Sequence, residues 1–244
     1  MEQINNFAKA TLGKVPEIVG LLGNINEDLA MEQFRENQSL YLGRKSLDPK
    51  MLSLIAIAVS AANGQSNSVN IHFSLSKKFG TEPFEILDAL KAAKMALMSS
   101  TMSTFKSSVP ILEEIGHVNT KSEEATKIVN KIKAETGMEK LPENLIALSK
   151  FSFDLFTEHL KEKSELLSPF MLGSKSVYLI SYAVSVSIQS EECSRTYLKQ
   201  FLMAGGSIAE VEDALAVSRF ITGNRAFITS IEMLRALATK PLEQ

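Results

Sequence analysis

Apolar residues recur at intervals of three and four along almost the whole chain, and the strict alternation typical of β-strands is hard to find. This pattern predicts an all-α fold. Asp48 followed by Pro49 is a typical helix start, and Asn63 followed by Gly64 is a typical helix end. These signals predict a helix between them, with a mostly apolar sequence.

Further helices are expected from the same kinds of signal. Glycine closes the helix that we predict at about 66–79, and proline lies in the first turn of the next one, at about 81–98. Three later helices are headed by Ser174, Ser190 and Ser207, and the last of these serines forms a capping-box pattern with Glu210. Additional amphipathic helices are predicted at 25–40, 121–139 and 145–161.

The chain matches itself when it is shifted by 125 or 126 residues. Upstream, Pro16-Glu17 recurs as Pro142-Glu143, a shift of 126. Downstream, the run 58–60 (Ala-Val-Ser) recurs at 183–185, and the run 88–90 (Asp-Ala-Leu) recurs at 213–215, a shift of 125. Such self-similarity predicts a tandem duplication, with a first helical repeat at 1–118 and a second at 119–244.

Composition and charge narrow the class of protein. The 244 residues are 45% hydrophobic and 22% charged, which is typical of a globular protein. A net charge of -2 without a basic run argues against a nucleic-acid partner. The longest uncharged stretch, 51–76, is too polar to span a membrane, and the first residues lack a secretory pattern. With Cys193 as the single cysteine, we expect a cytoplasmic protein.

One segment resembles a known family. It reads Leu-Asp-Pro-Lys at 47–50, Leu-Ile-Ala-Ile-Ala-Val-Ser-Ala-Ala-Asn-Gly at 54–64, a helix with His72, and Gly-Thr-Glu-Pro-Phe-Glu-Ile-Leu-Asp-Ala-Leu at 80–90. Residues 47–98, and more loosely 172–223, resemble the carboxymuconolactone decarboxylase family, which includes the alkyl hydroperoxidase D-like proteins. The resemblance implies a helical fold and an ancestral activity in peroxide reduction or decarboxylation.

The residues that carry the redox chemistry of that family are largely replaced. Redox-active members have Cys-x-x-Cys at a helix start, a His four residues later and a Glu a dozen residues before the first Cys. The corresponding positions are Ser53, Gln65, Ser68 and His72 in the first repeat, and Tyr178, Ser190, Cys193 and Tyr197 in the second. Serine and glutamine cannot form a disulfide, so neither repeat can run a dithiol cycle.

Three candidate catalytic residues therefore remain: His72, Cys193 and Ser68. Cys193 could reduce peroxide as a single cysteine, although Glu191 and Glu192 on the same helical turn would raise its pKa. Ser68 and His72, four residues apart, could hydrogen-bond as a nucleophile and base, but no acid orients the imidazole because Ser53 replaces the Glu.

His72 could instead transfer a proton in a decarboxylase-like pocket. The lactone acid that the family name implies is anionic and needs a cationic side chain, for which Arg44, Lys45 and Lys50 are candidates. The other histidines, His117 and His159, lie among charged residues and are expected at the surface. The sequence contains no metal-ligand spacing and no glycine-rich nucleotide loop, so we predict neither a metal nor a cofactor.

We therefore predict an oligomeric protein without thiol peroxidase activity that binds a small ligand in the ancestral cavity. The alternative is an enzyme that uses His72 or Cys193 without a dithiol. Family members resemble rings of single-repeat protomers, commonly trimers or hexamers. A fused pair would need half as many chains, which favours a homotrimer, with a dimer as the alternative.

Overall fold

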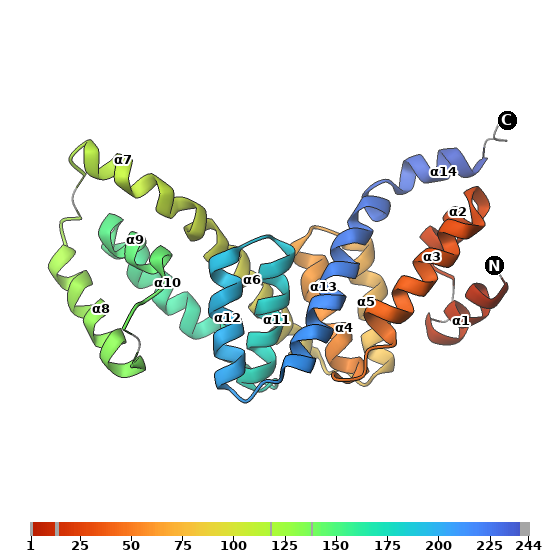
Figure 1. Cartoon of the computed structure of the whole chain (residues 1–244), viewed down its shortest axis with the longest axis horizontal. Coiled ribbons are helices and arrows are strands. Elements are labelled where there is room, and N and C mark those ends of the chain that lie inside the picture. Colours follow the sequence, from red (N-terminus) through yellow and green to blue (C-terminus); the bar gives the residue numbers. More distant parts are fainter. Residues whose placement is uncertain (1, 13–14, 118, 138, 240–244) are drawn as a thin grey trace.

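The computed structural model describes residues 2–12, 15–117, 119–137 and 139–239. Within these ranges the chain is helical and contains no β-strand, which confirms the all-α prediction (Figure 1). The helices form a central block with a helical wing on either side. None of the helices in the described ranges combines the length and apolar character needed to cross a lipid bilayer.

The central block contains the helices whose starts and ends the sequence marks most clearly. They are α4 (Pro49–Ala62), α5 (Ser66–Lys78), α6 (Pro83–Phe105), α11 (Ser174–Ser187), α12 (Glu191–Met203) and α13 (Ile208–Thr229). Their apolar side chains form one continuous core, in which α4 packs against α11 and both predicted repeats contribute buried residues. The core therefore joins the two predicted repeats.

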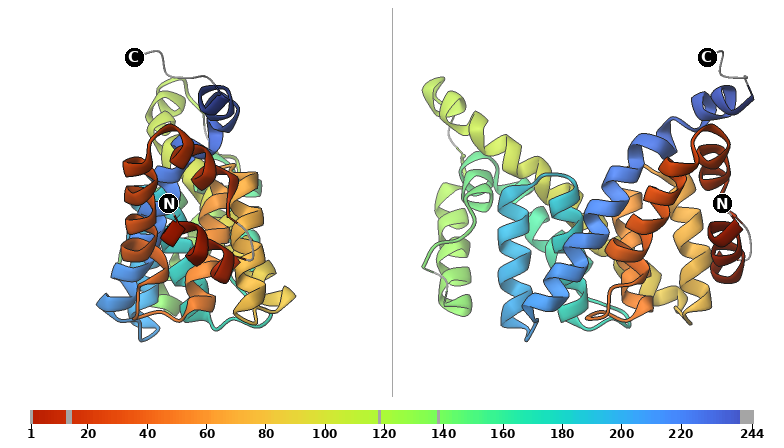
Figure 2. Two further views of the ribbon diagram at one scale, coloured as in Figure 1. Left: turned by 90° about the vertical axis from the view of Figure 1, so that its right-hand side faces the viewer. Right: turned by 45° about the vertical axis from the view of Figure 1, so that its right-hand side comes forward.

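The wings are built from the remaining elements. One wing contains α1 (Glu2–Leu12), α2 (Glu17–Ile25), α3 (Glu27–Asn37), a π-helical turn η1 (Gln38–Leu42) and α14 (Ile231–Thr239). The other contains a 3-10 turn η2 (Lys106–Ser108), α7 (Val109–Glu114), α8 (Ser122–Thr136), α9 (Glu143–Phe151) and α10 (Phe153–Leu166). The first wing thus combines segments that are far apart in sequence, such as α2 and α14, which lie side by side (Figure 2), whereas the second wing is built from consecutive elements.

The predicted capping signals act as expected. The Asp48 carboxylate accepts a hydrogen bond from the Met51 amide at 2.7 Å, which satisfies a free N–H at the start of α4. Gly64 and Gly80 have φ of +69° and +71°, a backbone conformation that suits glycine at helix ends. The capping box of Ser207 and Glu210 is also formed at the start of α13.

The helices predicted at 25–40 and 145–161 differ from the structure. The helix predicted at 145–161 is interrupted at Ser152, which accepts from the Leu155 amide. The helix predicted at 25–40 begins after Asn26, which accepts from the Leu29 amide, and continues as α3 and η1. An N-cap has extended backbone dihedrals, so it bends the chain between α2 and α3 and between α9 and α10. Helix α6 is also longer than predicted, and its last turns pack on α9 and α10.

Two buried aspartates tie the predicted repeats together. Asp88 of α6 accepts hydrogen bonds from the backbone N–H groups of residues 170–172, just before α11. Asp213 of α13 accepts from the N–H groups of residues 46 and 47, just before α4, and also pairs with Arg44. Each carboxylate is 1% exposed, and each fixes the entry of a helix from the other half.

Candidate functional site

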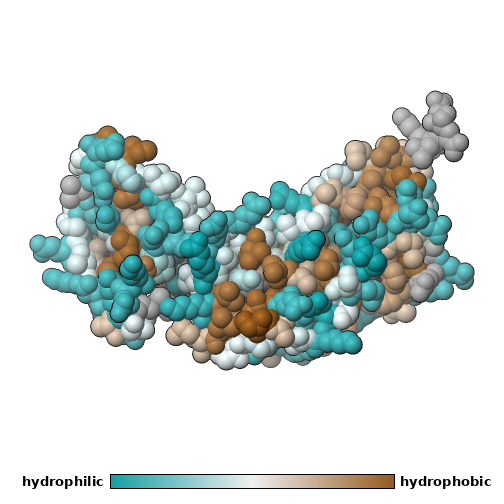
Figure 3. Space-filling view, viewed as in Figure 1, coloured by the Kyte–Doolittle hydropathy of each residue, from teal (hydrophilic) through white to brown (hydrophobic). Residues whose placement is uncertain are grey.

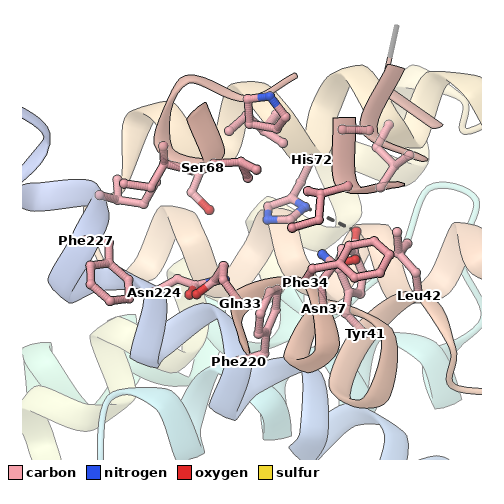
Figure 4. Close-up of a pocket in the computed structure, with 18 of the residues that line it drawn as sticks. Gln33, Phe34, Asn37, Tyr41, Leu42, Ser68, His72, Phe220, Asn224 and Phe227 are labelled. Carbon is pink, nitrogen blue, oxygen red and sulfur yellow. Dashed lines mark hydrogen bonds between the residues drawn. The ribbon is translucent and has the colours of Figure 1, made fainter. Parts of the chain in front are cut away.

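A cavity lies where α1, α2 and α3 of one wing meet α5 and α13 (Figure 4). Its volume, measured as the space open to the centre of a water molecule, is about 120 Å³, which is room for several waters or a small organic molecule. The lining is mostly apolar and includes Phe34, Phe220 and Phe227. We call it the His72 cavity.

His72 itself is buried and only 7% exposed. Its Nδ1 atom is 3.2 Å from the hydroxyl oxygen of Tyr41, which is fully buried in η1. Burial lowers the pKa of His72 to about 4, because an imidazolium in this apolar place would lose its hydration. The imidazole is therefore neutral at pH 7, with a fixed orientation and an Nε2 atom that has no hydrogen-bond partner among the described residues.

Ser68 also lines the cavity, but it does not pair with His72. Its hydroxyl lies 2.9 Å from the hydroxyl of Ser60 on α4, so the Ser68–His72 hydrogen bond that the spacing allowed is not formed. Ser53, at the position of the family's Glu, is buried and donates to the Lys50 carbonyl one helical turn earlier. These bonds make a serine nucleophile at this place less suitable.

The remaining polar groups of the cavity are uncharged. Gln33 of α3 donates to the side-chain oxygen of Asn224 on α13 at 2.8 Å, which links the wing to the central block. No Asp, Glu, Lys or Arg is found among the described residues that line the cavity. The expected cations are elsewhere, since Arg44 pairs with Asp213, Lys50 pairs with Glu85, and Lys45 is exposed.

Cys193 lies in a different cavity, in the other wing. This Cys193 cavity has a volume of about 20 Å³ by the same measure, and its lining is more polar. It is lined by Ser99, Pro142, Asn144, Leu145, His159, Lys163, Cys193, Thr196 and Tyr197. None of these residues lines the His72 cavity, so within one chain the structure does not bring His72 and Cys193 together.

The two cavities occupy matching places along the sequence. Every residue that lines the Cys193 cavity has a counterpart in the lining of the His72 cavity, and the two numbers differ by 126 or by 125 residues. The pairs are Pro16 and Pro142, Ile18 and Asn144, Val19 and Leu145, Gln33 and His159, Asn37 and Lys163, Ser68 and Cys193, Ile71 and Thr196, His72 and Tyr197, and Asn224 and Ser99. The lining positions thus correspond, while the cavities differ in volume and the lining is neutral in one and contains a lysine in the other.

The Cys193 cavity contains groups that the sequence did not single out. His159, expected at the surface, is only 9% exposed, because its side of α10 faces the cavity and not the solvent. Burial and the neighbouring Lys163 both lower the pKa of His159. Lys163 belongs to the charged run at 161–163 and gives no signal of burial, yet desolvation lowers its pKa while the Cys193 thiol raises it. His117, in contrast, is exposed as expected.

The two glutamates next to Cys193 are both occupied. Glu191 pairs with Arg195 at 3.0 Å on the outside of α12. Glu192 pairs with Lys106 at 3.2 Å and accepts a hydrogen bond from a backbone N–H of α9. Their charges are therefore largely compensated by these partners. Among the described residues, no group of three or more His, Cys, Asp or Glu side chains is placed to hold a metal ion.

The fold and the paired cavities define an all-α protein with a buried helical site in each wing. Residues 29–104, from α3 to the end of α6, match the model of the carboxymuconolactone decarboxylase family. The match covers less than half of the chain, and it agrees with the resemblance that the motifs at 47–98 predict. The tandem duplication stays a prediction.

A solved structure shows the same fold over nearly the full chain. It is the crystal structure of a protein from Burkholderia xenovorans described as a gamma-carboxymuconolactone decarboxylase subunit, with a TM-score of 0.77. The match covers 96% of each chain at 16% sequence identity, and at this identity the likeness establishes the fold alone. A search of curated proteins finds no significant match.

Proposed function

We propose that this protein binds a small, uncharged and largely apolar molecule in the His72 cavity, and that it lacks thiol peroxidase activity. The lining carries this proposal. An apolar cavity with a few fixed polar groups is the usual form of a small-molecule site. In the His72 cavity these groups are the His72–Tyr41 pair and the Gln33–Asn224 pair, which can orient a ligand through single hydrogen bonds.

The absence of a cation among the described lining residues argues against a lactone acid as the ligand. A carboxylate transferred into this cavity would lose its hydration without gaining an ion pair, which is strongly unfavourable. A neutral His72 could still act as a base toward an uncharged ligand. The decarboxylase-like alternative would therefore need a substrate without a buried carboxylate.

The proposed lack of peroxidase activity rests on the residues at the redox positions. The first repeat has Gln65 and Ser68 there, and the second has Ser190 and Cys193. Cys193 is the single thiol of the chain, so no resolving cysteine can close a disulfide within the protein. With hydroperoxide and a dithiol reductant in excess, we expect turnover no faster than in the Cys193→Ser variant. Turnover that is clearly faster than in this variant would contradict the proposal.

A matched pair of probes tests the ligand class. Benzyl alcohol and benzoate share a ring, but only benzoate is charged at pH 7. We expect benzyl alcohol to raise the melting temperature in a saturable way, since it binds the native state only, and benzoate to have no such effect. Equal effects of the two probes would contradict an uncharged ligand class.

Two variants on the same helix test the place of binding. Ala8 is 6% exposed and lines the His72 cavity, whereas Ala10 is exposed on α1. Ala8→Phe should fill the cavity and abolish the effect of benzyl alcohol, and Ala10→Phe should leave it unchanged. If benzyl alcohol stabilises both variants as it does the wild type, it binds elsewhere.

We also propose that the chain forms a homo-oligomer, with a trimer favoured. Exposed apolar side chains gather on the central block, over α11 to α13 in the view of Figure 3. They include Met203 and Ile208, which are 75% and 71% exposed in the single chain. Contact between chains would remove such surface from water. Light scattering after size exclusion tests this proposal, and a monomer at micromolar concentration would refute it.

The cytoplasm is the location that we propose for this protein. A single cysteine that is buried and unpaired suits a reducing compartment. Fractionation of cells with an antibody against the protein tests this proposal.

A further inference from the structure

Two polar side chains in the Cys193 cavity make no hydrogen bond within the described part of the chain. Asn144 is 6% exposed and His159 is 9% exposed, and neither side chain makes a hydrogen bond to the described residues. Burial of a polar group without a hydrogen bond costs free energy, so such groups normally meet a protein atom, a water or a ligand. Here both side chains open onto the same small cavity.

A lysine faces the same cavity without a carboxylate. Lys163 lines it from α10 and forms no ion pair with the described acidic residues. On the lining helix α12, Glu191 is already held by Arg195, and Glu192 is held by Lys106 and by a backbone N–H. The cavity therefore contains a half-buried amine and a buried histidine with no negative partner among the described residues, and an ammonium ion that is partly removed from water favours a compensating charge nearby.

The size and remaining lining of the cavity restrict what can supply that charge. The volume of about 20 Å³ leaves room for one occupant about as large as a water molecule. Cys193 lies in the first turn of α12, where the helix dipole favours negative charge. The donors are the side chains of Asn144 and His159, because the Thr196 hydroxyl already donates to the Glu192 carbonyl. Cation, donors and size together fit a small anion.

We propose that the Cys193 cavity binds one small monovalent anion of about the size of chloride, held by Lys163 with Asn144 and His159. This site is separate from the His72 cavity and does not depend on the function proposed for that cavity. The counterpart of Lys163 there is Asn37, so the other wing lacks the cation and should bind no such anion.

Binding at this site is linked to pH. The titratable groups that face Lys163 are His159 on α10 and Cys193 and Tyr197 on α12, while α6 and α9 contribute none to the lining. Burial lowers the pKa of Lys163, whereas a bound anion favours the charged form of its amine. Where the amine is neutral, it must therefore take up a proton when the anion binds. Affinity should therefore fall as the pH rises.

Equilibrium dialysis with radioactive chloride tests the proposal. Sodium gluconate, whose anion is too large for the cavity, keeps the ionic strength constant. We expect saturable binding of a single chloride per chain at pH 7. Lys163→Met should weaken it at least about tenfold, which is the loss expected for one charged hydrogen bond. Lys161→Met makes the same charge change at an exposed position two residues away and should leave it unchanged.

The Cys193→Ser variant separates the anion from a thiolate. If an external anion balances Lys163, this variant should bind chloride as the wild type does. If chloride binds to Cys193→Ser but not to the wild type, the thiolate is the counter-ion and the proposal is wrong. It is equally wrong if the wild type shows no saturable binding, because water alone then fills the cavity, or if Lys163→Met binds chloride with unchanged affinity.

Discussion

The buried His72 should make the protein sensitive to acid in a way that can be calculated. An imidazole has an ordinary pKa near 6.5, and burial lowers that of His72 to about 4. The unfolded chain therefore binds a proton at this residue at a higher pH than the native protein does. The contribution of His72 to the free energy of unfolding is therefore fully present well above pH 6.5. It is lost as the pH falls toward 4.

The magnitude follows from the two pKa values. A difference of about 2.5 corresponds to about 3.4 kcal/mol once the pH lies below both values. At pH 5.0, where the unfolded chain is protonated and the native protein is not, the loss relative to neutral pH is about 2 kcal/mol. Because the side chain is only 7% exposed, solvent screening reduces this value little.

The His72→Gln variant isolates this contribution. Glutamine cannot titrate, but it can still hydrogen-bond the Tyr41 hydroxyl. Urea denaturation at pH 7.5 and pH 5.0 gives the free energy of unfolding for both proteins, and the wild type should lose about 2 kcal/mol more than the variant. His159 titrates in both proteins and cancels. Losses that agree within about 0.5 kcal/mol would refute the burial of a neutral imidazole at this position.

Two further substitutions test the packing that positions the site. Asp213→Ala leaves two backbone N–H groups before α4 without their acceptor and should lower the free energy of unfolding in urea by about 3–5 kcal/mol. Glu212→Ala, at an exposed position, should lower it by less than about 1 kcal/mol. Similar losses in the two variants would contradict this role of Asp213. Gly206→Ala would place a methyl group against the buried ring of Phe201 and should lower stability by about 1–3 kcal/mol, while Gly173→Ala meets no atom and should change it little. A tolerated Gly206→Ala would show that the ring can move.

The sequence predicts the central helices well because their signals are local. Asp48, Pro49, Gly64 and Gly80 each act through their own backbone geometry, and the apolar run between 52 and 59 needs no distant information to be placed in a core. The helix starts after Asn26 and Ser152 were also detectable, because both residues are good N-caps at matching positions of the predicted repeats.

The second site is harder to predict because its chemistry depends on tertiary packing. Lys163 and His159 lie on a polar, charged helix that reads as solvent-exposed, and only the packing of α10 against α9 and α6 turns them inward. A comparison between the predicted repeats pairs them with Asn37 and Gln33, which line the His72 cavity. That these positions line a cavity, however, can be seen only in the structure.

The most direct test of the central claim is the position of benzyl alcohol in the bound protein. Nuclear Overhauser effects between its ring protons and protein protons in solution report contacts within a few ångströms. We predict contacts to His72, Phe34 and Phe227, which line the His72 cavity from α5, α3 and α13. If the bound ring contacts only residues outside this cavity, the cavity is not the ligand site and the proposed function is wrong.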